Sequence, residues 1–380
     1  MKKDKIIFVT NTPSEYRIPL FQQLCVQYPV RLVFTRYHLA EKIYGNKIDK
    51  KKMSLINHTV INNGLKGYKE LSNIIKQESV EGVVMPPMDS IIETLYSYWV
   101  YHCGRKYGKK VYYYWEKWEA PKDMQPLKKR IKNYVQRIIS SHLFRKTDYC
   151  FGMGTKACEY FMKNGVEPQK CGITYNTSIS PICELTSWRK DAGIPDGKEI
   201  IMYFGRVIEK KGLRFLIKAM SQLSDYEKEK TWLVVAGDGP DKNKLEEYAE
   251  QLCIQNISWL GYIHPDYRYD YFKQCDIFVL PTYHFQGSVE GWGLTINEAI
   301  QCGKLVIGTT AVGSAYDLIT NENGRIVIPE SSEEIANAIA DLLKPGMKES
   351  AAIKDKELME LYNYKNSAST FIQQFVKVAR

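Results

Sequence analysis

Two short stretches in the second half of the sequence combine residue types that could hold a diphosphate. In the first, Gly205 and Arg206 follow the apolar run IIMYF, and Lys211 comes five residues later, ahead of a predicted helix. A guanidinium can hold phosphate oxygens through two parallel hydrogen bonds, and an ammonium adds a point charge. A lysine-rich turn is more often simply solvated, so this pattern alone leaves both interpretations open.

The second stretch is EGWGLTINE, residues 290–298, which follows the predicted strand DIFVLPT. If a helix begins near Gly293, the free amides of its first turn can bind a diphosphate. Glu298 would then lie just over one turn inside that helix, within reach of a ribose, and Glu290 would precede it. The alternative is that both glutamates are solvated. The order of the two stretches, with VVAGDGP and LGYI between them, favours the binding interpretation.

Strand-like and helix-like segments must position these residues, and they alternate in both halves of the chain. Such alternation predicts α/β architecture with two parallel sheets that carry helices on both faces. Ser331 and Glu334 predict a capping box at the start of a late helix. The predicted strands cover residues 5–9, 30–35, 82–85, 110–114 and 148–151 in the first half, and residues 199–204, 231–236, 256–260, 276–280, 304–307 and 324–328 in the second.

The ordered motifs GRVIEKKG, AGDGP, GYI and EGWGLTINEAIQCGKLVI resemble the donor domain of retaining glycosyltransferases with the GT-B fold, family 4. The resemblance is strong over residues 199–330 and weak before residue 145. It implies two facing Rossmann-like domains with an interdomain cleft. Residues 1–180 would form the acceptor-binding domain, with a possible return of residues 361–380 to it, and residues 181–360 would bind the nucleotide sugar.

The resemblance also implies a role for individual residues. Glu290 would contact the donor sugar, and Arg206 and Lys211 would stabilise the leaving diphosphate, which makes these three the predicted catalytic residues. Glu298 would bond the ribose. The other predicted donor-binding positions, which include a phosphate cradle and a residue beside the base, are Gly205, Gly237, Ile263, Gly291, Trp292, Gly293 and Leu294.

Breaking a glycosyl–phosphate bond builds negative charge on the departing diphosphate, and preorganised donors there are the largest available catalytic term. Enzymes without such a clamp can use a divalent metal bound by a D-x-D motif. The sequence has no D-x-D, so we expect transfer without a metal or other cofactor. The resemblance implies that the transfer is retaining, and we expect a UDP- or GDP-linked sugar as the donor. A glycosidase needs two carboxylates about 5–9.5 Å apart. Eight helical positions would separate Glu290 and Glu298 by about 12 Å, which favours transfer over hydrolysis.

In the first half, the segment TNTPSEYRIPL, residues 10–20, forms a strand-to-helix loop that would face the acceptor. Ser14 and Arg17 in this loop, with Glu116 from YYYWEKWEAP, are the predicted acceptor-binding residues. The loop lacks the glycine pair that many relatives carry here, and the later segment lacks their histidine. The segment FGMGTKA imitates a dinucleotide fingerprint, but no acidic residue follows about 20 positions later, so we interpret it as a structural turn.

Charge divides unevenly along the chain. The 53 Lys and Arg residues outnumber the 43 Asp and Glu residues, for a net charge of +10, and residues 1–183 carry +15 while residues 184–380 carry −5. The segment PLKKRIKNYVQRIISSHLFRK, residues 126–146, predicts a basic amphipathic helix that could lie on an anionic membrane. The alternative is a surface helix whose apolar stripe packs on its own sheet. No nucleic-acid-binding motif is present, so nucleic acid is not an expected partner.

Nine cysteines without a C-x-x-C pair argue for a reducing compartment. The first apolar run is too short for a secretory signal, and no run is long enough for a membrane-spanning helix. We therefore expect a cytoplasmic protein with peripheral contact at the inner face of the plasma membrane. The expected partners are a nucleotide sugar and a glycan or lipid-linked glycan acceptor. The alternative function is a catalytically silent GT-B fold module that binds a nucleotide at the membrane surface.

Overall fold

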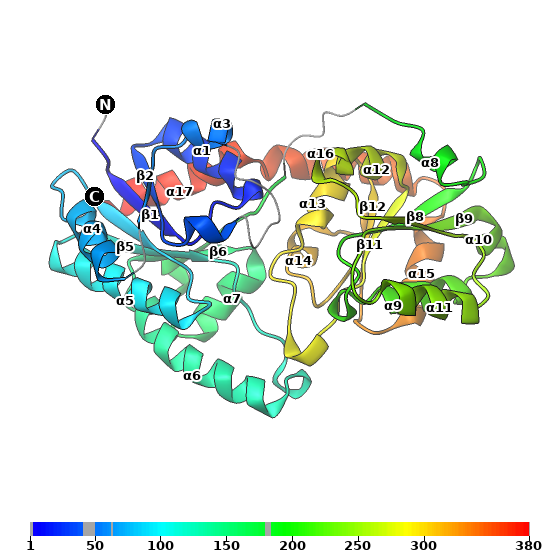
Figure 1. Ribbon diagram of the computed structural model, residues 1–380, viewed down its shortest axis with the longest axis horizontal. Helices are drawn as coiled ribbons and strands as arrows, with labels where there is room; N and C mark the ends of the chain where they lie inside the picture. The colour runs from blue at the N-terminus through cyan, green and yellow to red at the C-terminus, as the bar shows by residue number, and fades with distance from the viewer. Residues whose placement is uncertain (1–2, 41–49, 62–63, 179–183, 380) are drawn as a thin grey trace. The chain divides into compact units, whose positions relative to one another are not determined.

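The computed structural model describes residues 3–40, 50–61, 64–178 and 184–379. Contacts divide the chain into two compact units (Figure 1). The first comprises Met1–Trp118, Arg130–Thr177 and Tyr362–Arg380, and the second comprises Glu119–Lys129 and Ser178–Leu361. The predicted domains end at residues 180 and 360. Residues 119–129, which fall within the predicted first domain, cluster with the second unit.

The first unit is built on a seven-stranded sheet in the order β3-β2-β1-β4-β5-β6-β7, in which every pairing is parallel. Its strands β1, β4 and β6 are buried over their whole length because helices cover both faces. The strands are β1 (Ile6–Thr10), β2 (Val30–Phe34), β3 (His58–Val60), β4 (Gly82–Met85), β5 (Lys110–Trp115), β6 (Tyr149–Met153) and β7 (Cys171–Thr174).

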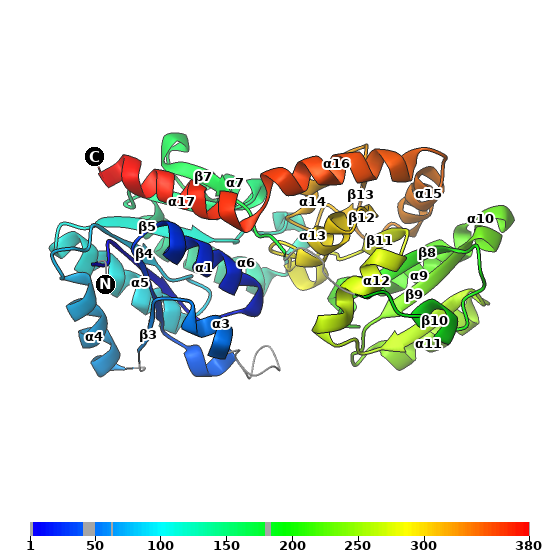
Figure 2. The same ribbon diagram turned by 90° about the horizontal axis from the view of Figure 1, so that it is seen from above.

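The helices α4, α5 and α7 pack into the core on one face of this sheet, and α1 and α17 lie side by side on the other (Figure 2). The C-terminal helix α17 is fixed there by Phe371, whose ring centroid lies 5.0 Å from that of Tyr114 and 4.5 Å from that of Phe151. The helices are α1 (Ile18–Gln27), α3 (Lys50–Ser54), α4 (Leu65–Ile75), α5 (Ile91–Lys106), α6 (Leu127–Phe144), α7 (Thr155–Lys163) and α17 (Tyr364–Ala379), with 3-10 turns at Glu15–Arg17, Tyr37–Leu39, Lys122–Met124 and Pro168–Lys170.

The second unit holds a six-stranded parallel sheet in the order β10-β9-β8-β11-β12-β13. Helices α9, α11 and α15 cover one face, and α12, α13 and α16 the other (Figure 1). The strands are β8 (Glu199–Phe204), β9 (Thr231–Ala236), β10 (Ile257–Gly261), β11 (Ile277–Leu280), β12 (Leu305–Thr309) and β13 (Gly324–Val327). The helices are α8 (Trp188–Asp191), α9 (Leu213–Gln222), α10 (Asp225–Lys230), α11 (Lys242–Gln251), α12 (Arg268–Gln274), α13 (Leu294–Gln301), α14 (Ala315–Leu318), α15 (Ser332–Leu342) and α16 (Met347–Leu361), with 3-10 turns at Glu209–Lys211, Pro265–Tyr267 and Phe285–Gly287.

The predicted parallel sheets are confirmed, with two local corrections. The edge strands β3 and β7 were not among the predicted strands, because they are short and only partly buried. Of the two hydrogen bonds of the predicted capping box before α15, one is confirmed: the Ser331 hydroxyl accepts from the Glu334 amide at 3.1 Å. The other is wrong, because the Glu334 carboxylate accepts from the Ile328 amide and not from the Ser331 amide.

Helix α6 exposes the apolar stripe that the sequence predicts. The helix contains no Asp or Glu. Its buried residues, among them Phe144, all lie near its C-terminal end. The predicted stripe is 40–69% exposed, so it does not pack on the sheet of the first unit. No helix in the described ranges is long and apolar enough to cross a bilayer. The exposed stripe residues are Leu127, Ile131, Tyr134, Val135, Ile138 and Ile139.

Candidate functional site

The loop after β8 is held by the neighbouring strand-end loop. The Val207 amide donates to the Asp238 carbonyl at 2.9 Å, and the Gly205 amide donates to the Ala236 carbonyl at 3.0 Å. A side chain at Gly237 would collide with the carbonyl of Gly205, so the two loops can approach this closely only because residue 237 is a glycine. Gly205 and Gly237, two of the residues predicted to bind the donor sugar nucleotide, therefore act here by setting the path of the backbone in these two loops.

Lys211 and Glu290 meet at this edge of the sheet. The Lys211 ammonium lies 2.7 Å from the Glu290 carboxylate, and both side chains are about one-fifth exposed. Lys211 ends a 3-10 turn, and Gly212 follows it with a φ of +70°, where a side chain would collide with the Pro281 carbonyl. The Glu290 backbone pairs with the segment after β12, since its amide donates to the Ala311 carbonyl at 2.9 Å.

The Glu290 carboxyl is the acidic member of this pair. Burial raises its pKa, but attraction to Lys211, the hydrogen bond that Lys211 donates and the charge of Lys210 together outweigh burial and hold the pKa below its usual value. The carboxylate is therefore ionised at neutral pH. An ionised carboxylate only accepts hydrogen bonds, so Glu290 is suited to hold hydroxyl groups rather than to donate a proton.

Arg206 differs from Lys211 in being exposed. Its guanidinium has no hydrogen-bond or ion-pair partner among the residues that the structure describes. The backbone around it is fixed, since the Tyr203 hydroxyl donates to the Arg206 carbonyl at 2.6 Å. Arg206 thus offers five N–H donors from a defined position at the end of β8.

The start of α13 supplies a second group of donors. The predicted helix start at Gly293 is the N-cap of α13, and no side chain caps it. Within the described part of the chain, the amides of Leu294 and Thr295 donate to no other group. The buried Trp292 donates from its indole to Asn297 at 2.7 Å and fixes the turn that precedes the helix. These first-turn amides are available to an anion.

Glu298 lies in α13 as expected, but it has a partner that the sequence analysis missed. Arg268, at the start of α12, places its Nε 2.9 Å from the Glu298 carboxylate, and the glutamate is 4% exposed. Burial raises the pKa of Glu298 to about 7 against the opposing charge of Arg268. Ile263, the residue predicted beside the base, is half-buried on the chain between β10 and α12.

In the first unit, the structure brings two of the three predicted acceptor residues together. The Arg17 guanidinium lies 3.8 Å from the Glu116 carboxylate and 4.6 Å from the centre of the Trp115 ring. Arg17 is buried and Glu116 is about one-quarter exposed. Ser14 is fully buried, and its hydroxyl has no hydrogen-bond partner among the described residues. Its predicted contact with an acceptor stays a prediction.

Comparison with known proteins relates the second half of the chain to a family of glycosyltransferases. Residues 185–358 match the model of the glycosyl transferases group 1 family. We call this matched stretch the group 1 domain. The domain contains the four side chains Arg206, Lys211, Glu290 and Glu298.

Two curated relatives match part of this chain. The uncharacterized glycosyltransferase MJ1607 of Methanocaldococcus jannaschii is 27% identical over 216 residues, which are 56% of this chain and 52% of that protein. The alpha-monoglucosyldiacylglycerol synthase of Streptococcus pneumoniae is 33% identical over 133 residues, which are 35% of this chain and 28% of that protein. The chain thus spans about half, or less, of the length of these relatives.

A solved structure extends the likeness to the whole chain. The structure of Anabaena HepE in complex with UDP has a TM-score of 0.75 at 14% identity and covers 98% of this chain and 100% of that one. HepE was also solved with UDP-glucose. The likeness confirms the predicted GT-B fold of two Rossmann-like domains with parallel sheets.

The structure adds candidate site residues in each of the two units that the sequence did not predict. In the first unit, Glu93 is 3% exposed and accepts from Asn11 at 3.1 Å and from the Ser90 hydroxyl at 2.9 Å, with Arg36 at 3.4 Å. This cluster follows β1 and β4 at the same sheet edge as Arg17. The only sequence signal was that Glu93 interrupts the apolar stretch 91–100, where it looked like a break rather than a site.

In the group 1 domain, the loop before Glu290 is strained and braced. Gln286 has a φ of +49°, which is uncommon outside glycine and often marks a functional loop. Gly287 packs against Gln125, so the excursion 119–129 contacts this loop. Burial lowers the pKa of the neighbouring His284, which is therefore neutral at pH 7. No local sequence pattern could reveal that a segment some 160 positions away braces this loop.

Proposed function

We propose that the chain is a retaining glycosyltransferase that moves a sugar from a nucleoside diphosphate sugar to a glycan or lipid-linked glycan acceptor. The donor is a UDP- or GDP-linked sugar, and no metal is required. The observation that carries the proposal is the Lys211–Glu290 ion pair at 2.7 Å, with the exposed Arg206 after β8 and the uncapped start of α13 after β11. They follow the neighbouring strands β8 and β11, as a diphosphate site requires. The UDP and UDP-glucose complexes of HepE support the choice of donor class.

Each group has a defined part in the transfer. The bond between the anomeric carbon and the diphosphate breaks, a bond from that carbon to the acceptor oxygen forms, and the acceptor proton ends on the diphosphate. Arg206, Lys211 and the amides of α13 balance the charge that develops on the leaving group, which is worth most when the donors are already in position. Glu290 accepts hydrogen bonds from sugar hydroxyls and holds Lys211 in place. The Glu298 carboxylate bonds the ribose.

The acceptor is bound by the first unit, and we propose that it is carried by a lipid at the inner face of the plasma membrane. The exposed apolar stripe of α6, on a helix with five Lys and Arg residues and no acid, supports peripheral contact with an anionic bilayer. The name of the pneumococcal relative, a diacylglycerol-modifying synthase, supports a lipid-linked acceptor. Arg17, Glu116 and Ser14 are the proposed acceptor-binding residues, and the protein acts on the cytoplasmic side.

The alternative is a catalytically silent module that binds a nucleotide without turnover. An intact clamp of Arg206, Lys211 and Glu290 argues against it, because binding alone does not need groups that act on a leaving diphosphate.

The test is a panel of UDP- and GDP-linked sugars with a lipid-linked glycan acceptor, assayed for release of the nucleoside diphosphate. The proposal predicts turnover with at least one donor in buffer that contains a metal chelator, and a product with the anomeric configuration of the donor. Nucleotide binding without release from any donor would favour the silent module. Turnover abolished by the chelator would contradict the metal-free mechanism alone.

A further inference from the structure

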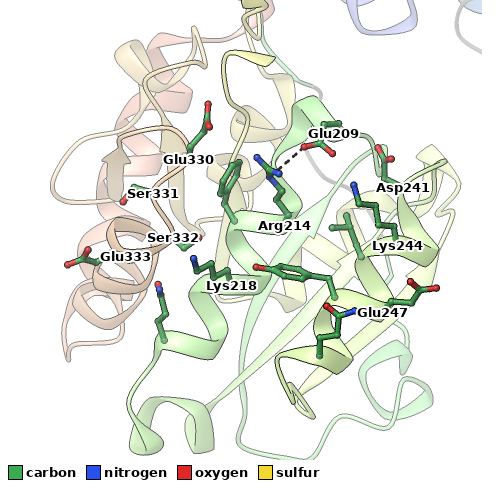
Figure 3. Close-up of a pocket in the computed structure, with 15 residues that line it drawn as sticks. Glu209, Arg214, Lys218, Asp241, Lys244, Glu247, Glu330, Ser331, Ser332 and Glu333 are labelled. Carbon is green, nitrogen blue, oxygen red and sulfur yellow. Dashed lines mark ion pairs between the residues drawn. The ribbon is translucent and has the colours of Figure 1, made fainter. Parts of the chain in front are cut away.

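A groove on the group 1 domain lies outside the donor site. It has a volume of about 690 Å³ and runs between α9, α11 and the loop before α15 (Figure 3). That volume falls within the range of small-molecule sites, about 300–1,000 Å³. None of the fifteen described residues that line it belongs to the predicted donor set. The groove is therefore separate from the site of transfer.

Two features around the start of α15 have an energetic cost. The Ser332 hydroxyl is buried and has no hydrogen-bond partner in the described ranges, although the residue is only 6% exposed and lines the groove. Buried polar groups without a partner are rare in folded proteins, and those that persist call for an explanation such as a ligand. Glu330, two residues earlier, has a φ of +68°, and strained residues of this kind cluster at ligand sites.

The composition of the walls indicates a neutral ligand rich in hydroxyl groups. Five carboxylates and three cations line the groove, so its net charge is negative and disfavours phosphates and other anions. The cations Arg214 and Lys218 lie between the loop of Glu330 and Ser332 on one side and Asp241 and Glu247 on the other (Figure 3). Alternating acceptors and donors of this kind suit a polyol, whose hydroxyls both donate and accept.

Aromatic side chains complete the site. Phe215 and Tyr248 line the groove and are only partly buried against the core. The Arg214 guanidinium lies over the Phe215 ring, 4.5 Å from its centre, and Tyr248 supplies a second ring with a hydroxyl at its tip. A pyranose ring has the matching combination, with apolar C–H faces and a rim of hydroxyls. A groove with aromatic faces and charged hydrogen-bonding rims therefore fits a saccharide better than an apolar molecule.

We propose that this groove is a second saccharide-binding site, which holds a neutral oligosaccharide away from the donor clamp. The groove also borders the clamp along the chain. Glu209 lines it, pairs with Arg214 at 3.5 Å and stands two residues before Lys211 in the same 3-10 turn. Tyr283, at the start of the strained loop before Glu290, donates a hydrogen bond from its hydroxyl to the Glu209 carboxylate at 2.8 Å. The proposal does not depend on the transferase activity, since it concerns binding alone.

The test measures binding of maltotriose, cellotriose and chitotriose by saturation-transfer-difference NMR and calorimetry. Each trisaccharide is titrated up to about 10 mM, so that even weak binding is detected. At least one should saturate the wild-type protein. Ser332→Ala should weaken that binding at least fivefold while the unfolding temperature stays equal or rises, because the change removes an unpartnered buried hydroxyl. Phe215→Ala should weaken it as well, and Tyr226→Ala, an exposed aromatic outside the groove, should not.

Arg206→Ala separates this site from the donor clamp, and trisaccharide binding should persist in that variant. The proposal is overturned if no trisaccharide binds, if the groove variants bind as tightly as wild type, or if binding is lost in Arg206→Ala. Displacement of the trisaccharide by inorganic phosphate from the groove residues would contradict its neutral character.

Discussion

Two glutamates of one motif, eight positions apart, have opposite electrostatic environments. Lys211 holds the pKa of Glu290 below its usual value, whereas burial raises that of Glu298 to about 7 despite Arg268. The residue types and their spacing were enough to select both glutamates as candidates. Their ionisation depends on cations 79 and 30 positions away in the sequence, and no local pattern specifies such a pairing.

The raised pKa of Glu298 predicts a pH dependence of nucleotide binding. Between about pH 6 and about pH 8 the group passes from mostly protonated to mostly ionised, and the ionised form can accept from both ribose hydroxyls. UDP affinity of the wild type relative to Glu298→Gln should therefore rise about three- to tenfold over that range, as isothermal titration calorimetry would measure. Titration of the phosphate itself is common to both proteins. A ratio that stays constant with pH would contradict the assignment of Glu298 to the ribose.

At the scale of elements, the strand-end loops were well predicted because their glycines and charges are contiguous in sequence. The start of α13 at Gly293 and the turn that ends in Lys211 lie where the motifs indicated. Strands β3 and β7 were missed, and residues 119–129, which the prediction includes in the first domain, cluster with the second unit. Edge strands are short, and a loop that crosses to another unit carries no periodicity, so neither leaves a local signal.

Gly212 offers a test of how tightly this loop is built. Gly212→Ala should destabilise the protein by about 2–4 kcal/mol, because its φ is +70° and a side chain would collide with the Pro281 carbonyl. Gly193→Ala is the matched control, since its φ is +68° but nothing lies within 4 Å of the added carbon. That variant should lose only about 1 kcal/mol in denaturant unfolding. Equal losses in the two variants would mean that the contact with Pro281 does not constrain the loop.

At the scale of the whole molecule, the charge asymmetry separates two tasks. The surplus of +15 in residues 1–183 includes the cations of α6, whereas the clamp of Arg206 and Lys211 lies in a half with a net charge of −5. The sequence predicted the amphipathic stripe of α6 but left open whether the stripe was buried. Burial depends on what the rest of the fold places against a helix, and only the structure shows that the stripe is exposed.

Liposome flotation tests the role of α6. The protein should float with vesicles that contain anionic lipid at low salt and dissociate as salt rises, since the cations contribute about 1 kcal/mol each near the surface. The double variant Ile131→Ser and Ile138→Ser should float much less. Val26→Ser, which removes an apolar residue that is 78% exposed on α1, should float as the wild type does. Failure of the wild type to float at any salt concentration would argue against peripheral membrane contact.

Turnover of the variants Arg206→Ala and Glu290→Ala is the most direct test of the diphosphate clamp. Arg206 is exposed, so Arg206→Ala should keep the unfolding temperature of the wild type within a few degrees. Glu290 is about one-fifth exposed and pairs with Lys211, so Glu290→Ala should lower the unfolding temperature more, while the protein stays folded. Each should lose at least about two decades of turnover with the best nucleotide sugar. For Arg206 this is the typical loss when one preorganised donor is removed, and for Glu290 it reflects the loss of the acceptor that holds Lys211 and the sugar hydroxyls. Full activity in either folded variant would contradict the clamp and with it the proposed mechanism.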